Sequence, residues 1–213
     1  MRPQRKTRAR YLVGIDEAGR GPLAGPVAVG AVCIDTKDKK AMRALRILGT
    51  PLKDSKQLSE KQREERYEAL RKISKKGGFF YEVALIGSRT IDSRGITYAI
   101  KRGIVSVLRR LPAGLPRTMK VLLDGGLSAP PEYPQQTFIK GDERYLPIAF
   151  ASIVAKVRRD RIMDAYDIEY PKYHFSRHKG YGTSLHVNMI ARHGLSPIHR
   201  RTFCTRIRKN SRG

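Results

Sequence analysis

Short apolar runs with the composition of β-strands recur along the chain. They are rich in Val, Ile, Leu, Phe and Tyr, and a charged residue or a glycine follows each of them. Runs of this length with such boundaries predict strands rather than helices. Five strands are expected, over residues 11–15, 27–34, 79–86, 120–124 and 136–140.

Between these strands, other segments have the spacing and the end signals of helices. From Ser88 to Leu111, apolar residues recur every four or five positions opposite a basic face, which predicts one helix lying on the sheet. Ser59 is placed to cap a helix that runs to about Lys75, and Thr183 to cap a short one that ends at His193. A further helix is expected over about 143–165, and 41–49 is either a short basic helix or a loop. Alternating strands and helices predict an α/β fold.

Carboxylates follow two of the strands directly. Asp16 and Glu17 end the first strand ahead of the run Gly19-Arg20-Gly21, and Asp124 ends the fourth strand ahead of glycine. In open α/β sheets, ligands gather at the carboxyl ends of strands, so Asp124 is expected beside Asp16. Adjacent carboxylates raise each other's pKa unless a cation neutralises them, and a metal ion would do so. The alternatives are a charged turn in which Arg20 pairs locally with the acids and an ordinary Asp-Gly turn.

The expected helix over 143–165 carries a polar stripe among alanines and valines. Ser152, Lys156 and Asp160 are four residues apart, so they project from one face of the helix. This stripe is unusual for a core face, and it is a candidate part of the site. An exposed, ion-paired surface stripe remains the alternative, and Asp164 rivals Asp160 because it continues the same spacing.

The charge of the chain points to a polyanionic partner. Among 213 residues, 44 Lys and Arg face 19 Asp and Glu, which gives a net charge of +25. Nucleic acid fits this excess best, and the absence of a long apolar span argues against a membrane-surface protein. Residues 1–10 are expected to form a basic, disordered arm of a cytoplasmic protein, although a mitochondrial presequence is an alternative. Cys33 and Cys204 are isolated, which favours a reducing compartment.

The texture of the chain changes near residue 170. We expect a catalytic core over 11–169, on which a basic helical and loop segment, 170–213, packs within one structural domain. Tyr, His, Arg and Lys are interleaved up to Thr183, which suits contacts with phosphates and with sugar or base faces. His174 and His178 have the spacing of half a zinc site, but no further ligands complete it.

Five motifs, in this order, closely resemble ribonuclease HII of the bacterial type. They are Asp16-Glu-Ala-Gly-Arg-Gly, Asp54-Ser-Lys, Leu123-Asp-Gly, the helix stretch from Ala151 to Arg161 and His178-Lys-Gly-Tyr-Gly-Thr. The resemblance covers residues 13–203. It implies an RNase H-like fold, with a mixed five-stranded sheet flanked by helices and a small helical C-terminal part. It also implies an endonuclease that cuts the RNA strand of RNA–DNA hybrids and cuts 5′ to a single ribonucleotide embedded in duplex DNA.

The resemblance also assigns roles to individual residues. It implies that four acids are catalytic and hold two divalent ions, Mg²⁺ or Mn²⁺: Asp16, Glu17, Asp124 and Asp160. The loop that reads the ribose 2′-hydroxyl falls on Gly19, Arg20 and Gly21, and the tyrosine that packs on the sugar falls on Tyr181. Four further residues match positions near the substrate backbone: Lys56, Ser152, Lys156 and Lys179. Hydrolysis by two metal ions uses water as the nucleophile and leaves 3′-hydroxyl and 5′-phosphate ends.

The expected partners are RNA–DNA hybrids and ribonucleotide-containing DNA, with no membrane. We expect a monomer, and whether a component of the replication machinery recruits it is open. Three rival functions remain at this point: a basic nucleic-acid binder without activity, another two-metal nuclease of the same fold such as a junction resolvase, and a metal-free ribonuclease that leaves a 2′,3′-cyclic product.

Overall fold

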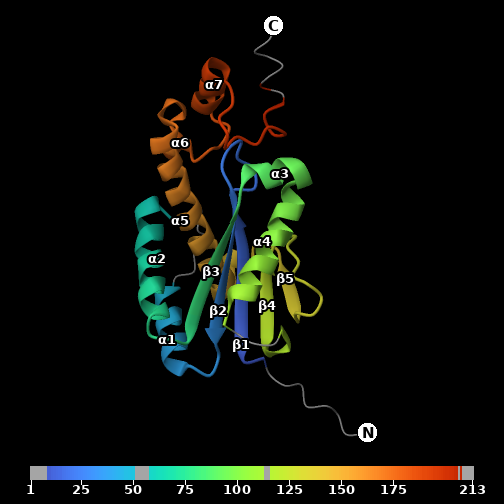
Figure 1. The fold of residues 1–213 in the computed structure, drawn as a ribbon. Helices are drawn as coiled ribbons and strands as arrows, with labels where there is room; N and C mark the ends of the chain where they lie inside the picture. Colours follow the sequence, from blue (N-terminus) through green and yellow to red (C-terminus); the bar gives the residue numbers. More distant parts are fainter. Residues whose placement is uncertain (1–8, 51–57, 113–115, 206, 208–213) are drawn as a thin grey trace.

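The computed structural model describes residues 9–50, 58–112, 116–205 and 207, and its centre is one mixed five-stranded sheet. The strand order is β3-β2-β1-β4-β5 (Figure 1). β2 pairs antiparallel with β1 and β3, whereas β4 pairs parallel with β1 and β5. The bounds are Tyr11–Ala18 for β1, Val27–Asp35 for β2, Phe79–Ile86 for β3, Met119–Asp124 for β4 and Gln135–Phe138 for β5. The expected mixed sheet is confirmed, although β5 ends before Lys140, whose positive φ of 53° leaves strand geometry.

Helices cover both faces of the sheet (Figure 1). Helices α1, α2 and α5 share a buried cluster with one face, while α4 packs on the other face. The helix bounds are α1 Lys39–Leu48, α2 Glu60–Ser74, α3 Ser88–Arg94, α4 Ile96–Arg110, α5 Leu146–Glu169, α6 Phe175–His178 and α7 Ser184–His193. Short 3₁₀ turns span Pro116–Thr118, Gly141–Glu143 and Pro171–Tyr173.

Several helix boundaries differ from the expected ones. The single helix expected over 88–111 is wrong, because Gly95, with φ of 81°, separates α3 from α4. Helix α5 begins at Leu146 rather than near residue 143, since a 3₁₀ turn precedes it, and it continues to Glu169. The caps are confirmed: the side chains of Ser59 and Thr183 accept hydrogen bonds from the first turns of α2 and α7.

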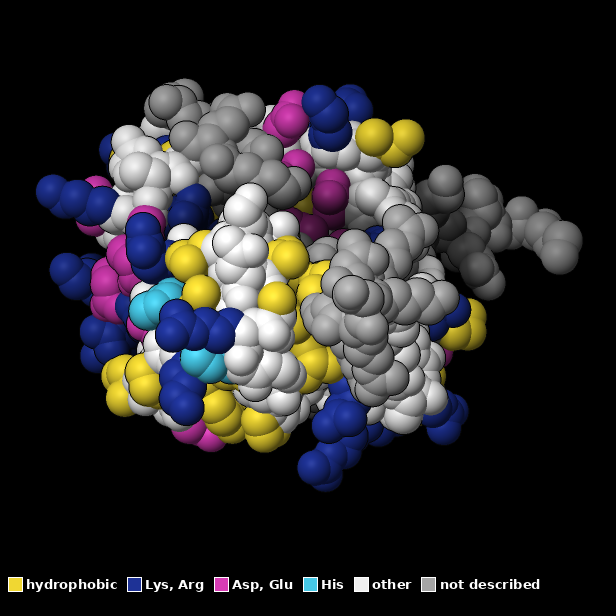
Figure 2. Space-filling model, turned by 90° about the horizontal axis from the view of Figure 1, so that it is seen from above, with side chains coloured by type: hydrophobic (Ala, Val, Ile, Leu, Met, Phe, Trp, Pro, Cys, Tyr) yellow, Lys and Arg dark blue, Asp and Glu magenta, His cyan; other side chains and the backbone are white. Residues whose placement is uncertain are grey.

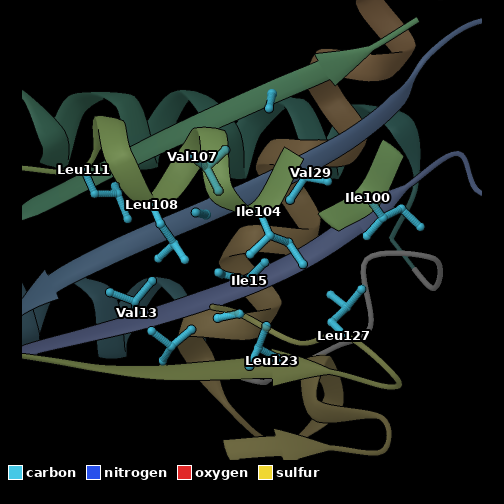
Figure 3. Close-up of a cluster of buried hydrophobic side chains, with 14 of the residues drawn as sticks. Val13, Ile15, Val29, Ile100, Ile104, Val107, Leu108, Leu111, Leu123 and Leu127 are labelled. Atoms are coloured by element: carbon cyan, nitrogen blue, oxygen red, sulfur yellow. The ribbon is translucent and has the colours of Figure 1, made fainter. Parts of the chain in front are cut away.

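Two hydrophobic clusters, one on each face, fix the sheet between its helices. On the α4 side, Val13 and Ile15 of β1 and Leu123 of β4 pack against Ile104 and Leu108 (Figure 3). On the other side, α5 approaches β1 so closely that a Cβ at Gly14 would lie 2.1 Å from the backbone of Pro147. Glycine at this position therefore lets α5 lie directly on the strand that carries Asp16.

The chain beyond α5 packs against the end of that helix. A third buried cluster joins Met163 of α5 to Tyr173, Phe175 and Ile198 and to Ala24 of the loop after β1. This cluster holds residues 171–205 beside the carboxyl end of β1, where α6 and α7 lie in Figure 1. Among the described residues, no helix combines the length and the apolar character needed to cross a membrane.

Candidate active site

Three acids meet at the carboxyl ends of two parallel strands. Ile15 of β1 is in register with Leu123 of β4, and both belong to the cluster under α4. Because side chains alternate along a strand, the next residues, Asp16 and Asp124, point to the opposite face, toward α5. The Asp16 carboxylate accepts a hydrogen bond from the hydroxyl of Ser152 on α5. The proximity of Asp16 and Asp124 expected from the sequence is thus confirmed.

The acids form an electrostatically frustrated group. Asp16 is 6% exposed, and burial, together with the charges of Glu17 and Asp124, raises its pKa to about 8. Burial also raises the pKa of Glu17, against the effect of Arg20, whose guanidinium lies 3.5 Å from the Glu17 carboxylate. A cation at this position would relieve the repulsion, and carboxylate oxygens are the ligands that Mg²⁺ and Mn²⁺ prefer. The donor chemistry of these acids therefore suits a divalent ion.

A cavity of about 270 Å³ connects these acids to the loop after β1. It is lined by Asp16, Glu17, Ala18, Gly19, Arg20, Gly21, Asp124, Ser152, Lys156 and Tyr181. Seen from above, Lys and Arg side chains lie around the rim of the molecule, while some Asp and Glu side chains are set back in a hollow (Figure 2). The setting suits a polyanionic ligand that reaches a recessed acidic centre.

The stripe on α5 is buried rather than exposed. Ser152 and Asp160 are each 5% exposed, so the alternative of a solvent-exposed stripe is wrong for both. Lys156 lines the cavity and donates from Nζ to Oδ1 of Asp160 at 2.7 Å. Arg63 and Arg159 lie 4.0 Å from the Asp160 carboxylate. The Asp160 carboxylate therefore lies among three cationic side chains, and Asp160 is not among the residues that line the cavity.

The acids come from separate elements and are not arranged as a complete set of metal ligands. Within the described part of the chain, no group of three or more His, Cys, Asp or Glu side chains is arranged to surround a metal ion. Asp124 is fixed by the backbone N–H of Gly141, which donates to its Oδ1 at 2.6 Å. The Asp124 side chain held by this contact also lines the cavity.

Comparisons with known proteins agree with the motifs. A family profile described as ribonuclease HII matches residues 13–206. Ribonuclease HII of Aliarcobacter butzleri is 41% identical over 194 residues, which cover 91% of both chains. That of Ruminiclostridium cellulolyticum is 42% identical over 193 residues, which cover 91% of this chain and 69% of the relative. This chain belongs to the ribonuclease HII family.

Solved structures of the family have the same fold. The ribonuclease H2 from Pyrococcus horikoshii OT3 has a TM-score of 0.72 at 27% identity, over 95% of this chain and 99% of that one. The RNase HII in a complex with PCNA from Archaeoglobus fulgidus has a TM-score of 0.68 at 26% identity, over 89% and 93%. As a ribonuclease HII, the chain is an endonuclease of the hydrolase class.

The remaining substrate residues expected for a ribonuclease HII are only partly gathered at the cavity. Tyr181 lines the cavity and is 43% exposed, with the Arg159 guanidinium 5.6 Å from its ring centre. Lys179 is not among the lining residues, because its Nζ is paired with Asp164 and lies 3.4 Å from Glu60. Asp164 thus faces Lys179 and not the other acids. Lys56 falls in 51–57, outside the described residues.

Two buried arginines support the site and were missed by sequence reasoning. Arg159 and Arg200 are both fully buried, and their guanidinium groups donate to backbone carbonyls of the loop after β1. Arg159 also excludes any side chain at Gly19, where φ is 84° and a Cβ would lie 1.9 Å from Nε. The spacing of Arg159 from the buried Ala155 and Met163, four residues on each side, was the available signal. Arg200 carries no such signal, since one arginine in a basic tail looks like the others.

Proposed function

We propose that this ribonuclease HII cleaves the RNA strand of RNA–DNA hybrids and cuts 5′ to a single ribonucleotide embedded in duplex DNA. The observation that carries the proposal is one cavity that combines buried, mutually repelling carboxylates with a glycine-containing loop and an exposed tyrosine. The acids suit a reaction on a phosphodiester, and the loop suits recognition of a ribose. A site built to hydrogen-bond a hydroxyl strongly rejects a sugar that lacks it.

The proposed ligands of two divalent ions, Mg²⁺ or Mn²⁺, are Asp16, Glu17, Asp124 and Asp160. When bound, such ions activate the attacking water and stabilise the leaving oxygen. The chain itself orients the acids: Ser152 donates to Asp16, Gly141 donates to Asp124 and Lys156 donates to Asp160. Because water rather than the ribose 2′-hydroxyl is the nucleophile, the products carry 3′-hydroxyl and 5′-phosphate ends.

The other lining residues bind the substrate in this proposal. Gly19, Arg20 and Gly21 read the 2′-hydroxyl, and Tyr181 packs on the adjacent sugar. Lys156, which lines the cavity, contacts the phosphate backbone in this proposal, and Lys179 does so only after it leaves Asp164. The net charge of +25 supplies affinity for the duplex without sequence preference, so binding should weaken steeply with salt.

A cytoplasmic location and a partner from the replication machinery complete the proposal. Cys33 and Cys204 are buried and free, which is compatible with a reducing compartment. The Archaeoglobus fulgidus relative was solved in a complex with PCNA, which supports a sliding clamp as a partner to test.

The test is cleavage of a labelled DNA duplex that contains one ribonucleotide, in the presence of Mg²⁺. An all-DNA duplex and a long RNA–DNA hybrid serve as the comparison substrates. We expect one cut 5′ to the ribonucleotide, cleavage of the hybrid, no cut in the all-DNA duplex and loss of all cleavage in EDTA.

Each rival function gives a different result in this assay. Binding without cleavage of any substrate indicates a nucleic-acid binder. A branched all-DNA substrate is added as a fourth substrate, and its cleavage indicates a junction resolvase. Cleavage that persists in EDTA and leaves a 2′,3′-cyclic end indicates a metal-free ribonuclease. Any of the three contradicts the proposal.

A further inference from the structure

Arg200 lies beneath the loop that carries the proposed ribose-reading residues. Its guanidinium donates to three carbonyl oxygens of this loop, from Nη2 to Gly19 at 2.7 Å, from Nη1 to Arg20 at 2.9 Å and from Nε to Gly25 at 3.0 Å. The backbone N–H of Arg200 donates to a fourth carbonyl, that of Leu23, at 2.8 Å. A single fully buried side chain thus fixes both ends of the loop.

These contacts determine which way the amides of the loop point. In a trans peptide the C=O and the following N–H are antiparallel. Since the carbonyls of Gly19 and Arg20 both point at Arg200, the N–H groups of Arg20 and Gly21 point away from it. Gly19, Arg20 and Gly21 line the cavity and Arg200 does not, so the N–H groups are turned toward the cavity side of the loop. Outward N–H donors held from behind are the arrangement that binds an oxygen ligand.

The residue before Arg200 is connected to Tyr181 by a chain of hydrogen bonds. The backbone N–H of Ser196 donates to Nδ1 of His199 at 2.9 Å, which leaves the ring proton of neutral His199 on Nε2. That proton is donated to Nε2 of His186 at 3.0 Å, and Nδ1 of His186 then donates to the carbonyl of Tyr181 at 2.9 Å. The series is complete only while both rings are neutral, and burial lowers the pKa of each to about 4.

We propose that His199 and Arg200 are positioning residues for ribose recognition. Arg200 aims the N–H groups of Arg20 and Gly21 into the cavity, and His199, through His186, fixes the backbone of Tyr181. Two consecutive residues of the C-terminal segment therefore connect the two elements that read the sugar. This inference rests on the proposed function of the loop and of Tyr181, and it adds the two residues that support their backbones.

Arg200→Lys tests the first half, because lysine keeps the charge but lacks the planar fork that spans several carbonyls. We expect kcat/KM at a single ribonucleotide to fall by about tenfold to a hundredfold, the cost of displacing a recognition group by about 1 Å. The dissociation constant for an all-DNA duplex should stay within about twofold, since Arg200 is buried and contributes no exposed charge.

The matched control is Leu70→Ala, which removes a fully buried side chain of α2 from the hydrophobic cluster on the α5 face of the sheet. It lowers stability without touching the loop. Each variant is assayed at the same interval below its own melting midpoint, so that a merely structural effect appears equally in both. An Arg200→Lys enzyme with the kcat/KM of Leu70→Ala overturns the proposal.

His199→Phe and His199→Gln test the second half. Phenylalanine keeps the ring volume but donates nothing, whereas glutamine places an N–H near the position of Nε2. We expect His199→Phe to lower kcat/KM at a single ribonucleotide and His199→Gln to restore most of the loss. Equal activities of the two variants contradict the role of His199.

A readout without substrate separates this inference from the proposed function. In protein labelled with ¹⁵N-glycine, the amide signals of Gly19 and Gly21 should shift in Arg200→Lys and stay in place in Leu70→Ala. If wild-type protein fails to cleave while these signals shift, the proposed function fails and the positioning role stands. If the signals do not move, the positioning role fails whatever the activity.

Discussion

The two sides of the cavity are built on opposite electrostatic principles. On the acid side, Asp16, Glu17 and Asp124 repel one another, and burial raises the pKa values of the first two. On the loop side, the carbonyls between Gly19 and Pro26 accept hydrogen bonds from two buried guanidinium groups, those of Arg159 and Arg200. On the acid side the repulsion is offset only in part, by Arg20 beside Glu17. On the loop side the carbonyls find their donors within the chain.

This difference suits the two sides of the cavity to different parts of the proposed reaction. A surface that distinguishes a ribose from a deoxyribose must be fixed before the substrate arrives, because a mobile donor adapts to either sugar. A group of acids that gains its counter-charge from outside becomes competent only when cations and a phosphate are present. Changes on the acid side should therefore abolish the reaction, and changes on the loop side should weaken it by degrees.

The largest expected effect follows from Asp124→Asn. The amide oxygen of asparagine still accepts from the N–H of Gly141, so the fold is kept, while one negative charge is lost. We expect kcat to fall by at least about 1,000-fold, since Asp124 is a proposed metal ligand and such a ligand contributes several kcal/mol to the transition state. Affinity for an all-DNA duplex, measured by fluorescence anisotropy, should be unchanged. Full cleavage activity in this variant would remove Asp124 from the site.

The next effect separates Asp160 from its rival. Asp160 is buried beside Lys156, whereas the Asp164 side chain is 43% exposed and pairs with Lys179. We expect Asp160→Asn to lose at least about 100-fold in kcat, as the loss of one charge-positioned group commonly does, and Asp164→Asn to stay close to wild type. Single-turnover cleavage of the duplex with one ribonucleotide measures both. The reverse result would move the fourth ligand to Asp164.

This pair also shows how far the sequence determined the site. The strand ends that hold Asp16 and Asp124 were predictable, because alternation and parallel register follow from short apolar runs. Spacing along one helix left Asp160 and Asp164 equivalent, and only the resemblance to ribonuclease HII chose between them. Lys179 was expected at the substrate, but its partner Asp164 lies fifteen positions earlier in the chain, and no local pattern records that contact. The burial of Arg200 depends on a loop 180 residues away and was equally invisible.

The loop side should be sensitive to acid. His186 and His199 have pKa values lowered to about 4 by burial and by neighbouring rings, against about 6.5 when unfolded. A lowered pKa means that the unfolded chain binds more protons. The contribution of each histidine to the free energy of unfolding is therefore complete above pH 6.5 and is lost as the pH drops toward 4. The loss should reach roughly 1 to 3 kcal/mol per histidine. Urea unfolding at pH 7, 5.5 and 4.5 measures it.

The matched comparison for this titration is His199→Gln against His193→Gln. His193 is exposed and outside the His186–His199 contact, so its replacement controls for the loss of an imidazole elsewhere on the surface. His199→Gln removes one buried titration and should flatten the dependence between pH 6.5 and 4. Neither substitution changes a carboxylate, so the difference between the two curves isolates the histidine. Parallel curves for the two variants would contradict a neutral His186–His199 pair.

The smallest expected effect is that of Tyr181→Ala. The ring is 43% exposed at the cavity, while the backbone beneath it is held through the Tyr181 carbonyl by His186. Loss of the ring removes a stacking surface worth about 1 to 3 kcal/mol, so kcat/KM at a single ribonucleotide should fall by about tenfold. Tyr181→Phe keeps the ring and should keep most of the rate. An unaffected rate in Tyr181→Ala would exclude the ring from recognition. His186 still holds the backbone of residue 181 after this change, so we expect measurable cleavage in Tyr181→Ala but almost none in Asp124→Asn. The ratio of the two losses in activity therefore compares the pre-formed loop side of the cavity with the acid side, which needs cations from outside.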